Sequence, residues 1–134
     1  MERKFKKSIG SLNEIFAFVD ESVSALKVDA SVAYAITLAV EEFFTNMVKY
    51  SPEASNDVSI SLRREGDRLM VTMVDNGVRP FDVTRADNVD TSLPLEDRKV
   101  GGLGIHLVRN MLDSVTYDYA DRQSRITFIK NLEK

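Results

Sequence analysis

The stretch EEFFTNMVKYSP, residues 41–52, ends a long apolar segment and mixes polar groups with large apolar side chains. Glu42 and Asn46 are four residues apart, so on a helix they share one face, whereas Glu41 projects about 100° away. A carboxylate beside an amide can orient or deprotonate a hydroxyl, and an amide oxygen suits Mg²⁺. A solvated helix end would also use these residue types, so this stretch alone does not decide between the two.

The sequence up to the end of this stretch predicts two helices and a short strand. ASVAYAITLAVEEFFTNMVKYS follows Asp29, is apolar on most sides and predicts a buried helix that Pro52 helps to end. Residues 11–26, SLNEIFAFVDESVSAL, also have helical spacing, and Ser11 with Glu14 fits a capping box. Residues 2–9 are basic and predict a short edge strand.

The chain downstream predicts two hairpins separated by a loop. VSISLRRE and RLMVTMVD flank a Gly66-Asp67 turn, and the second strand is apolar on both faces near its end, so we expect it to be central. Residues 78–100 lack periodicity, as binding loops and lids do. GGLGIHLVRNMLD then opens a helix, and VTYDYAD with SRITFIKNL forms a second hairpin that turns near residues 121–123.

This order of elements predicts an α+β fold. We expect a two-layer α/β sandwich, with helices on one face of a mixed, mostly antiparallel sheet. The 134 residues favour a single domain over 1–134.

Composition excludes several classes of function. The net charge of −3 and the pI near 5.2 argue against non-specific binding to nucleic acid or to anionic membranes. The absence of cysteine excludes disulfides and thiolate metal sites, and a lone histidine, His106, cannot form a histidine cluster. No apolar run is long enough to span a membrane. We therefore expect a cytoplasmic protein that binds neither membrane nor nucleic acid.

Two further motifs carry chemistry. VDNG, residues 74–77, puts Asp75 and Gly77 where a buried strand ends, although the same letters also form plain turns. GGLGIHLV, residues 101–108, places glycines where a helix begins, and such a terminus offers free N–H groups to an anion. It is neither a Walker loop, because no G-K-[ST] follows, nor a Rossmann fingerprint. A flexible hinge explains these glycines equally well.

The three motifs together resemble the GHKL, or Bergerat-fold, ATP-binding family. E-x-x-x-N on a helix, D-x-G after a strand, a loop, and G-x-G into a helix follow in that family's order. Within it, VDNGVRPFD and GGLGIHLVRNMLD look most like the boxes of bacterial anti-sigma-factor serine/threonine kinases. The resemblance covers roughly residues 5–130 and implies a histidine-kinase-like ATPase domain with an ATP lid at about 78–102.

The resemblance also assigns roles. Glu42 matches the general base, Asn46 the Mg²⁺ ligand, Asp75 the acceptor of the adenine amino group and Gly77 the glycine beneath the base. The matched phosphate-binding residues at the end of the lid are Gly101, Gly102, Leu103, Gly104 and Ile105. Lys49 and Tyr50 resemble a Lys-Tyr pair that approaches the nucleotide in histidine kinases, and Ser124 takes the place of a threonine near adenine.

The chain departs from the family pattern at several positions. Anti-sigma kinases usually carry histidine near the position of Tyr50, and Gln123 stands where a glycine is expected. Arg98 and Lys99 fit either γ-phosphate contacts or solvated lid charges. We interpret His106 as a surface or packing residue, and Phe81 as packing at the edge of the pocket.

The resemblance implies a kinase that uses ATP and Mg²⁺. It would phosphorylate a serine on a small antagonist of the sulfate-transporter/anti-sigma-antagonist (STAS) type and sequester a sigma factor or another response regulator; a homodimer is compatible with it. One alternative is an ATP-gated protein-binding module with little or no kinase activity. Another is the ATP-binding part of a sensor histidine kinase, which the absence of a dimerisation helix with a phospho-accepting histidine disfavours.

Overall fold

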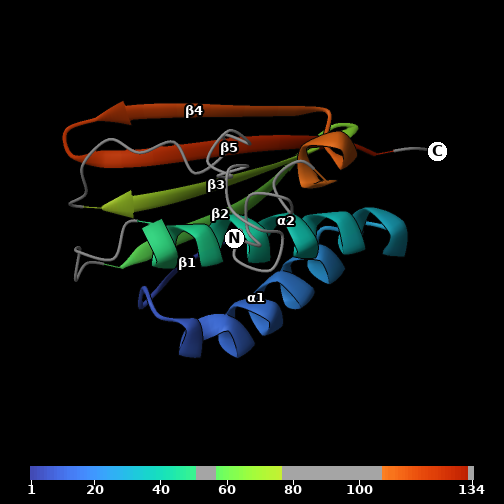
Figure 1. Cartoon of the computed structure of the whole chain (residues 1–134). Helices are drawn as coiled ribbons and strands as arrows, with labels where there is room; N and C mark the ends of the chain where they lie inside the picture. The colour runs from blue at the N-terminus through green and yellow to red at the C-terminus, as the bar shows by residue number, and fades with distance from the viewer. Residues whose placement is uncertain (51–56, 77–106, 133–134) are drawn as a thin grey trace, which may run out of the picture.

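The computed structural model describes residues 1–50, 57–76 and 107–132 (Figure 1). Its elements are, in chain order, β1 (Glu2–Phe5), the 3-10 turn η1 (Ile9–Ser11), α1 (Leu12–Ala25), α2 (Ala30–Tyr50), β2 (Val58–Glu65), β3 (Arg68–Asn76), β4 (Ser114–Ala120) and β5 (Gln123–Asn131). Residues 107–111 are also helical. Within the described ranges, no helix is both long and apolar enough to cross a membrane.

The five strands form one sheet in the order β1-β2-β3-β5-β4. Each pairing among these strands is antiparallel, so the described sheet lacks the parallel component that a mixed sheet would have. The predicted edge strand β1 and the predicted central position of β3 are both confirmed. The β4–β5 turn uses Asp121 and Arg122, whose φ angles of 53° and 62° are those of a type I′ hairpin turn.

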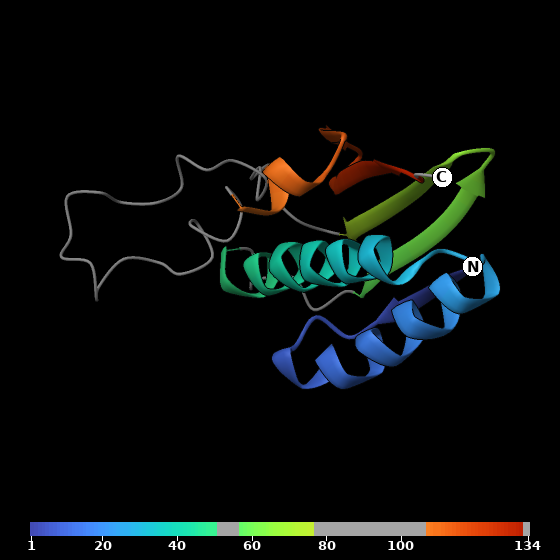
Figure 2. The ribbon, with the colours of Figure 1, turned by 90° about the vertical axis from the view of Figure 1, so that its right-hand side faces the viewer.

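The helices cover one face of the sheet, which gives the predicted two-layer α+β sandwich (Figures 1 and 2). The core lies between the layers and includes Phe43 of α2 against Phe128 of β5, with ring centroids 5.4 Å apart. Phe5 of β1 packs on Phe18 of α1 at 5.6 Å. Period-2 alternation therefore sends one set of strand side chains into this core and the other set to the open face.

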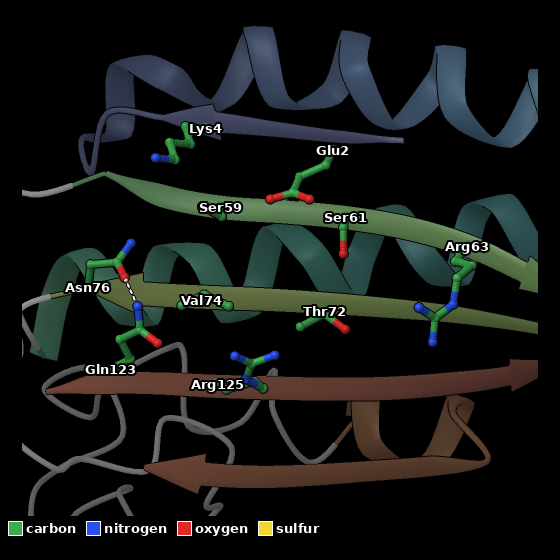
Figure 3. A pocket seen from close by; sticks show the side chains of 10 residues that line it. All are labelled: Glu2, Lys4, Ser59, Ser61, Arg63, Thr72, Val74, Asn76, Gln123 and Arg125. Atoms are coloured by element: carbon green, nitrogen blue, oxygen red, sulfur yellow. Dashed lines mark hydrogen bonds between the residues drawn. The ribbon is translucent and has the colours of Figure 1, made fainter. Parts of the chain in front are cut away.

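The open face of the sheet is polar. A hollow of about 380 Å³ lies there, and side chains from four strands line it. Figure 3 shows these side chains on the sheet, with helix behind it. Near the end of β3, Gln123 Nε2 donates a hydrogen bond to Asn76 Oδ1 at 2.6 Å. Because Asn76 faces outward, its neighbour Asp75 faces the helical layer.

The two helices begin differently. Asp29 caps α2, since its Oδ1 accepts from the Val32 amide at 3.1 Å and from the Ser31 hydroxyl at 2.9 Å. These hydrogen bonds lower the pKa of the Asp29 carboxyl. The predicted capping box of Ser11 and Glu14 is wrong: Ser11 makes no side-chain cap, and its hydroxyl donates to the Lys6 carbonyl at 2.7 Å. Turn η1 precedes α1 and turns Ser11 back toward the strand.

Candidate functional site

Helix α2 brings Glu42 and Asn46 together as the four-residue spacing indicated. Asn46 is 1% exposed, and its Nδ2 donates to Glu42 Oε2 at 3.4 Å. Phe43, Phe44 and Met47 on the same helix are buried and fix its rotation against the core. The apolar residues thus determine which polar face of α2 points inward, and the carboxylate and the amide lie on that face.

Burial changes the acid–base behaviour of Glu42. Desolvation raises the pKa of its half-buried carboxyl, and the negative charge of Glu41 adds to the increase. The hydrogen bond from Asn46 and the positive charge of Lys49 act in the opposite direction. A carboxylate with a raised pKa is a stronger base than an exposed glutamate, which is the property a proton acceptor needs.

The amide oxygen of Asn46 fits a metal ligand. Asn46 Oδ1 is buried and has no hydrogen-bond partner in the described parts of the chain. Buried polar atoms in native proteins are nearly always paired, so an orphaned acceptor indicates a ligand such as a cation or an ordered water. No group of three or more His, Asp or Glu side chains gathers among the described residues. Mg²⁺ would therefore need further oxygen ligands, and the phosphates of a nucleotide can supply them.

Asp75 lies at the end of β3, on the helical side of the sheet. It is 1% exposed, and Lys7 Nζ lies 2.9 Å from its Oδ1 and 3.1 Å from its Oδ2. Lys7 is not among the site residues predicted from the sequence. The signal that could have found it is the alternation of Arg3, Phe5 and Lys7, which continues the inward phase of β1 past the end of the strand.

Ser124 of β5 lies directly opposite Asp75 in the sheet register. Residues opposite each other in an antiparallel pair share a face, so Ser124 also faces the helices. It is 6% exposed, and its hydroxyl is 3.3 Å from the Tyr117 hydroxyl. The structure therefore brings together the residues predicted to lie near adenine, Asp75 and Ser124.

The remaining predicted residues are less fully described. Lys49 is exposed in the last turn of α2, and Tyr50 is the last residue of that helix. The predicted lid and its phosphate-binding residues lie outside the described residues, namely Gly77, Gly101, Gly102, Leu103, Gly104 and Ile105. The same holds for Phe81, Arg98, Lys99 and His106.

The predicted residues that are described gather at one end of the sandwich. In Figures 1 and 2 the C-terminal end of α2 points to the end of the sheet where β3 stops and β5 begins. Acid–base and metal-binding groups thus come from the helix, and a buried carboxylate comes from the sheet. The hollow in Figure 3 is on the opposite face and contains none of these residues, so we do not assign the site there.

Two curated relatives are similar in sequence. A serine-protein kinase RsbW of Halalkalibacterium halodurans is 31% identical over 84 residues, which are 60% of this chain and 51% of the relative. A serine/threonine-protein kinase BtrW of Bordetella bronchiseptica is 25% identical over 100 residues, or 73% of this chain and 70% of the relative. The chain thus spans about half the length of the first relative.

Solved structures share the fold. The structure of the RsbU and RsbW domains of a Mycobacterium tuberculosis protein superposes with a TM-score of 0.67 at 14% identity, covering 100% of this chain and 32% of that one. A SiaB–SiaC complex from Pseudomonas aeruginosa gives 0.56 at 12% identity, with 97% and 88% covered. The Acinetobacter baumannii histidine kinase AdeS also gives 0.56 at 12% identity, with 100% and 68% covered.

A family model also matches nearly the whole chain. Residues 5–130 match the histidine kinase-like ATPase domain, in agreement with the resemblance seen in the motifs. The protein belongs to the histidine kinase-like ATPase domain family.

Proposed function

We propose that this protein is a serine/threonine protein kinase of the anti-sigma-factor type that binds ATP with Mg²⁺. The observation that carries the proposal is the pair on α2, where a half-buried carboxylate of raised pKa lies beside a buried amide with an orphaned oxygen. A purely structural helix end has no reason to bury this combination. The kinase names of the two curated relatives support the same activity.

Glu42 acts on the protein substrate in this proposal. Its carboxylate orients a serine hydroxyl and accepts the proton as the hydroxyl oxygen bonds to the γ-phosphorus of ATP and ADP leaves with the bridging oxygen. The hydrogen bond from Asn46 holds the carboxylate in position. Bound Mg-ATP supplies the phosphoryl group and the metal charge that stabilises its transfer. Asn46 Oδ1 would hold the metal, and Lys49 would reach a phosphate from the exposed end of the helix. The lid glycines Gly101, Gly102 and Gly104 complete phosphate binding by resemblance to the family.

The base of the nucleotide binds at the sheet in the same proposal. Asp75 accepts a hydrogen bond from the adenine amino group, and Ser124 lies beside it. Gly77, which follows β3, lets the base approach the backbone by resemblance to the family. The nucleotide thus extends from the end of β3 to the C-terminal end of α2.

The protein partners follow from the family resemblance. We propose a STAS-type antagonist as the substrate and a sigma factor or another response regulator as the protein held by the kinase, in the cytoplasm. A structure with this fold is found in a SiaB–SiaC complex, which supports a role in protein–protein association. A homodimer is compatible with the proposal.

Transfer of radiolabelled phosphate from ATP to the STAS proteins of the same genome tests the proposal. Glu42→Gln keeps the shape of the side chain and removes the base, so labelling falls by about 10²–10⁴-fold while ATP affinity is retained. Glu41→Gln is the matched control, since it removes the neighbouring carboxylate without touching the pair with Asn46, and it keeps most of the activity. Equal labelling by Glu42→Gln and wild type would contradict the base assignment. ATP binding without labelling of any antagonist would favour the ATP-gated binding module.

A further inference from the structure

Asp75, the proposed acceptor of the adenine amino group, forms a buried ion pair with Lys7. Lys7 Nζ contacts both oxygens of Asp75, at 2.9 and 3.1 Å, and each side chain is only 2% exposed. Other ion pairs of the described residues lie at the surface, such as Arg3 with Glu21, whose side chains are 54% and 68% exposed. The Lys7–Asp75 pair is therefore a different kind of feature, because burial makes such a pair sensitive to loss of either partner.

The sheet register explains how Lys7 reaches Asp75. Phe5, Val58 and Asp75 form one row across β1, β2 and β3, and Lys7 lies two residues beyond Phe5 in the same phase. Neighbouring strands are about 4.8 Å apart, so the side chain has to reach across the line of β2 to meet β3. A lysine side chain, with its long flexible stem, can do this while remaining attached at the sheet edge.

Hydrogen bonds hold the backbone that carries Lys7. The Lys6 carbonyl accepts from the Ser11 hydroxyl at 2.7 Å, and the Ser8 carbonyl accepts from the Ser11 amide at 2.9 Å. The Ser8 hydroxyl in turn accepts from the Gly10 amide at 3.2 Å. Ser11 thus links the start of α1 to the segment after β1, which keeps the lysine close to the carboxylate.

The ammonium group and a base amino group compete for the same acceptor. Both are N–H donors that require the Asp75 oxygens, and the Asp75 side chain is 2% exposed while Lys7 contacts it. Asp75 is fixed, because β3 is hydrogen-bonded to β2 on one side and β5 on the other. Lys7 lies on a short connection and has a flexible stem, so Lys7 is the partner that moves when a base enters.

We propose that Lys7 determines the nucleotide affinity of this site by holding the Asp75 carboxylate until the base displaces it. This inference rests on the proposed nucleotide site, in which Lys7 blocks the Asp75 carboxylate until the base binds. Apparent affinity falls in proportion to the fraction of protein in the open form. A closed form ten times more populated than the open form therefore weakens nucleotide binding by about tenfold.

The test compares Lys7→Met with Lys6→Met by calorimetric titration of Mg-ATP and of adenosine. Lys7→Met removes the ammonium and keeps a long apolar stem, whereas Lys6→Met removes the same charge from an exposed neighbouring residue. Each variant loses one positive charge, so long-range attraction to the phosphates changes in both and does not account for a difference in their affinities. We expect Lys7→Met to bind both ligands about tenfold more tightly than Lys6→Met.

A second variant, Ser11→Ala, weakens the Lys7–Asp75 contact indirectly. Ser11→Ala removes the hydrogen bond to the Lys6 carbonyl without changing the charge, so it loosens the segment that carries Lys7. We expect a smaller increase in adenosine affinity, about two- to threefold, in the same direction. This variant keeps the question testable if Lys7→Met does not fold.

The outcomes separate the inference from the proposed function. Equal affinity of Lys7→Met and Lys6→Met, or weaker binding by Lys7→Met, overturns the inference and leaves the nucleotide site intact; weaker binding would mean that Lys7 contacts the nucleotide. No ATP binding by wild type or by either variant overturns the nucleotide site and the inference with it.

Discussion

Asn46 on α2 and Asp75 on β3 are equally buried, at 1% exposure each, yet their surroundings differ. Asn46 Oδ1 has no hydrogen-bond partner among the described residues, whereas Asp75 is contacted by an ammonium group at both oxygens. The helix side of the candidate site is thus ready to receive a ligand. The sheet side is satisfied by the chain itself, and a ligand has to replace that contact.

The largest expected difference between the helix side and the sheet side of the site is the effect of substitutions on the free energy of unfolding. Lys7→Met leaves the Asp75 carboxylate buried without its ammonium partner, so we expect the free energy of unfolding to fall by about 3–5 kcal/mol. Asp75→Ala should reduce it by less, because the flexible lysine side chain can move out to water. Asn46→Ala removes an oxygen that has no partner among the described residues together with the Nδ2 donor that bonds Glu42 at 3.4 Å, so we expect a smaller loss, of about 1 kcal/mol. Urea unfolding of the three variants measures this order, and an Asn46→Ala loss as large as that of Lys7→Met would contradict the comparison.

A smaller effect is expected where the segment carrying Lys7 is anchored. Ser11→Ala loses the hydrogen bond to the Lys6 carbonyl and should reduce stability by about 1 kcal/mol. Glu14→Ala is the control: Ser11 makes no side-chain cap with which Glu14 could form a capping box, so its loss should stay within about 0.5 kcal/mol. Thermal unfolding of the two variants distinguishes them. Equal losses of stability in the two variants would indicate that Ser11 and Glu14 do form a capping box. They would also contradict the role of Ser11 in positioning Lys7.

The smallest effect concerns the charge of Glu42. Burial raises the pKa of its carboxyl above the ordinary value, so the folded protein retains this proton more tightly than the unfolded chain. The stability that this provides is present below the unfolded pKa and is lost as the pH rises through the folded pKa. Glu42→Gln should therefore be more stable than wild type at neutral pH, by less than about 1 kcal/mol because the group is only half-buried. The advantage should shrink as the pH falls and Glu42 of the wild-type protein takes up its proton, and an advantage that grows in acid would contradict the direction of the shift.

The sequence predicted the features that depend on local periodicity. The face shared by Glu42 and Asn46 follows from helix geometry, and the central position of β3 follows from its apolar character on both faces. The predicted capping box is wrong because the 3-10 turn η1 precedes α1. The Ser11 hydroxyl donates to the Lys6 carbonyl and does not accept from an amide of its own helix.

The contact between Lys7 and Asp75 could not be predicted in this way. It joins residues 68 positions apart and depends on the register of three strands, which no local pattern specifies. The predicted residues around Gly77 and between 101 and 105 remain predictions from the family resemblance, because they lie outside the described residues.

The central claim is that one nucleotide binds with its base at Asp75 and its phosphates near Asn46. Adenosine, which has no phosphates, tests the two ends separately when its dissociation constant is measured for wild type, Asp75→Ala and Asn46→Ala. We expect Asp75→Ala to weaken adenosine binding by about 10–100-fold, through loss of a hydrogen bond to a charged group, and Asn46→Ala to leave it unchanged. Adenosine binding that is unchanged in Asp75→Ala would contradict the claim.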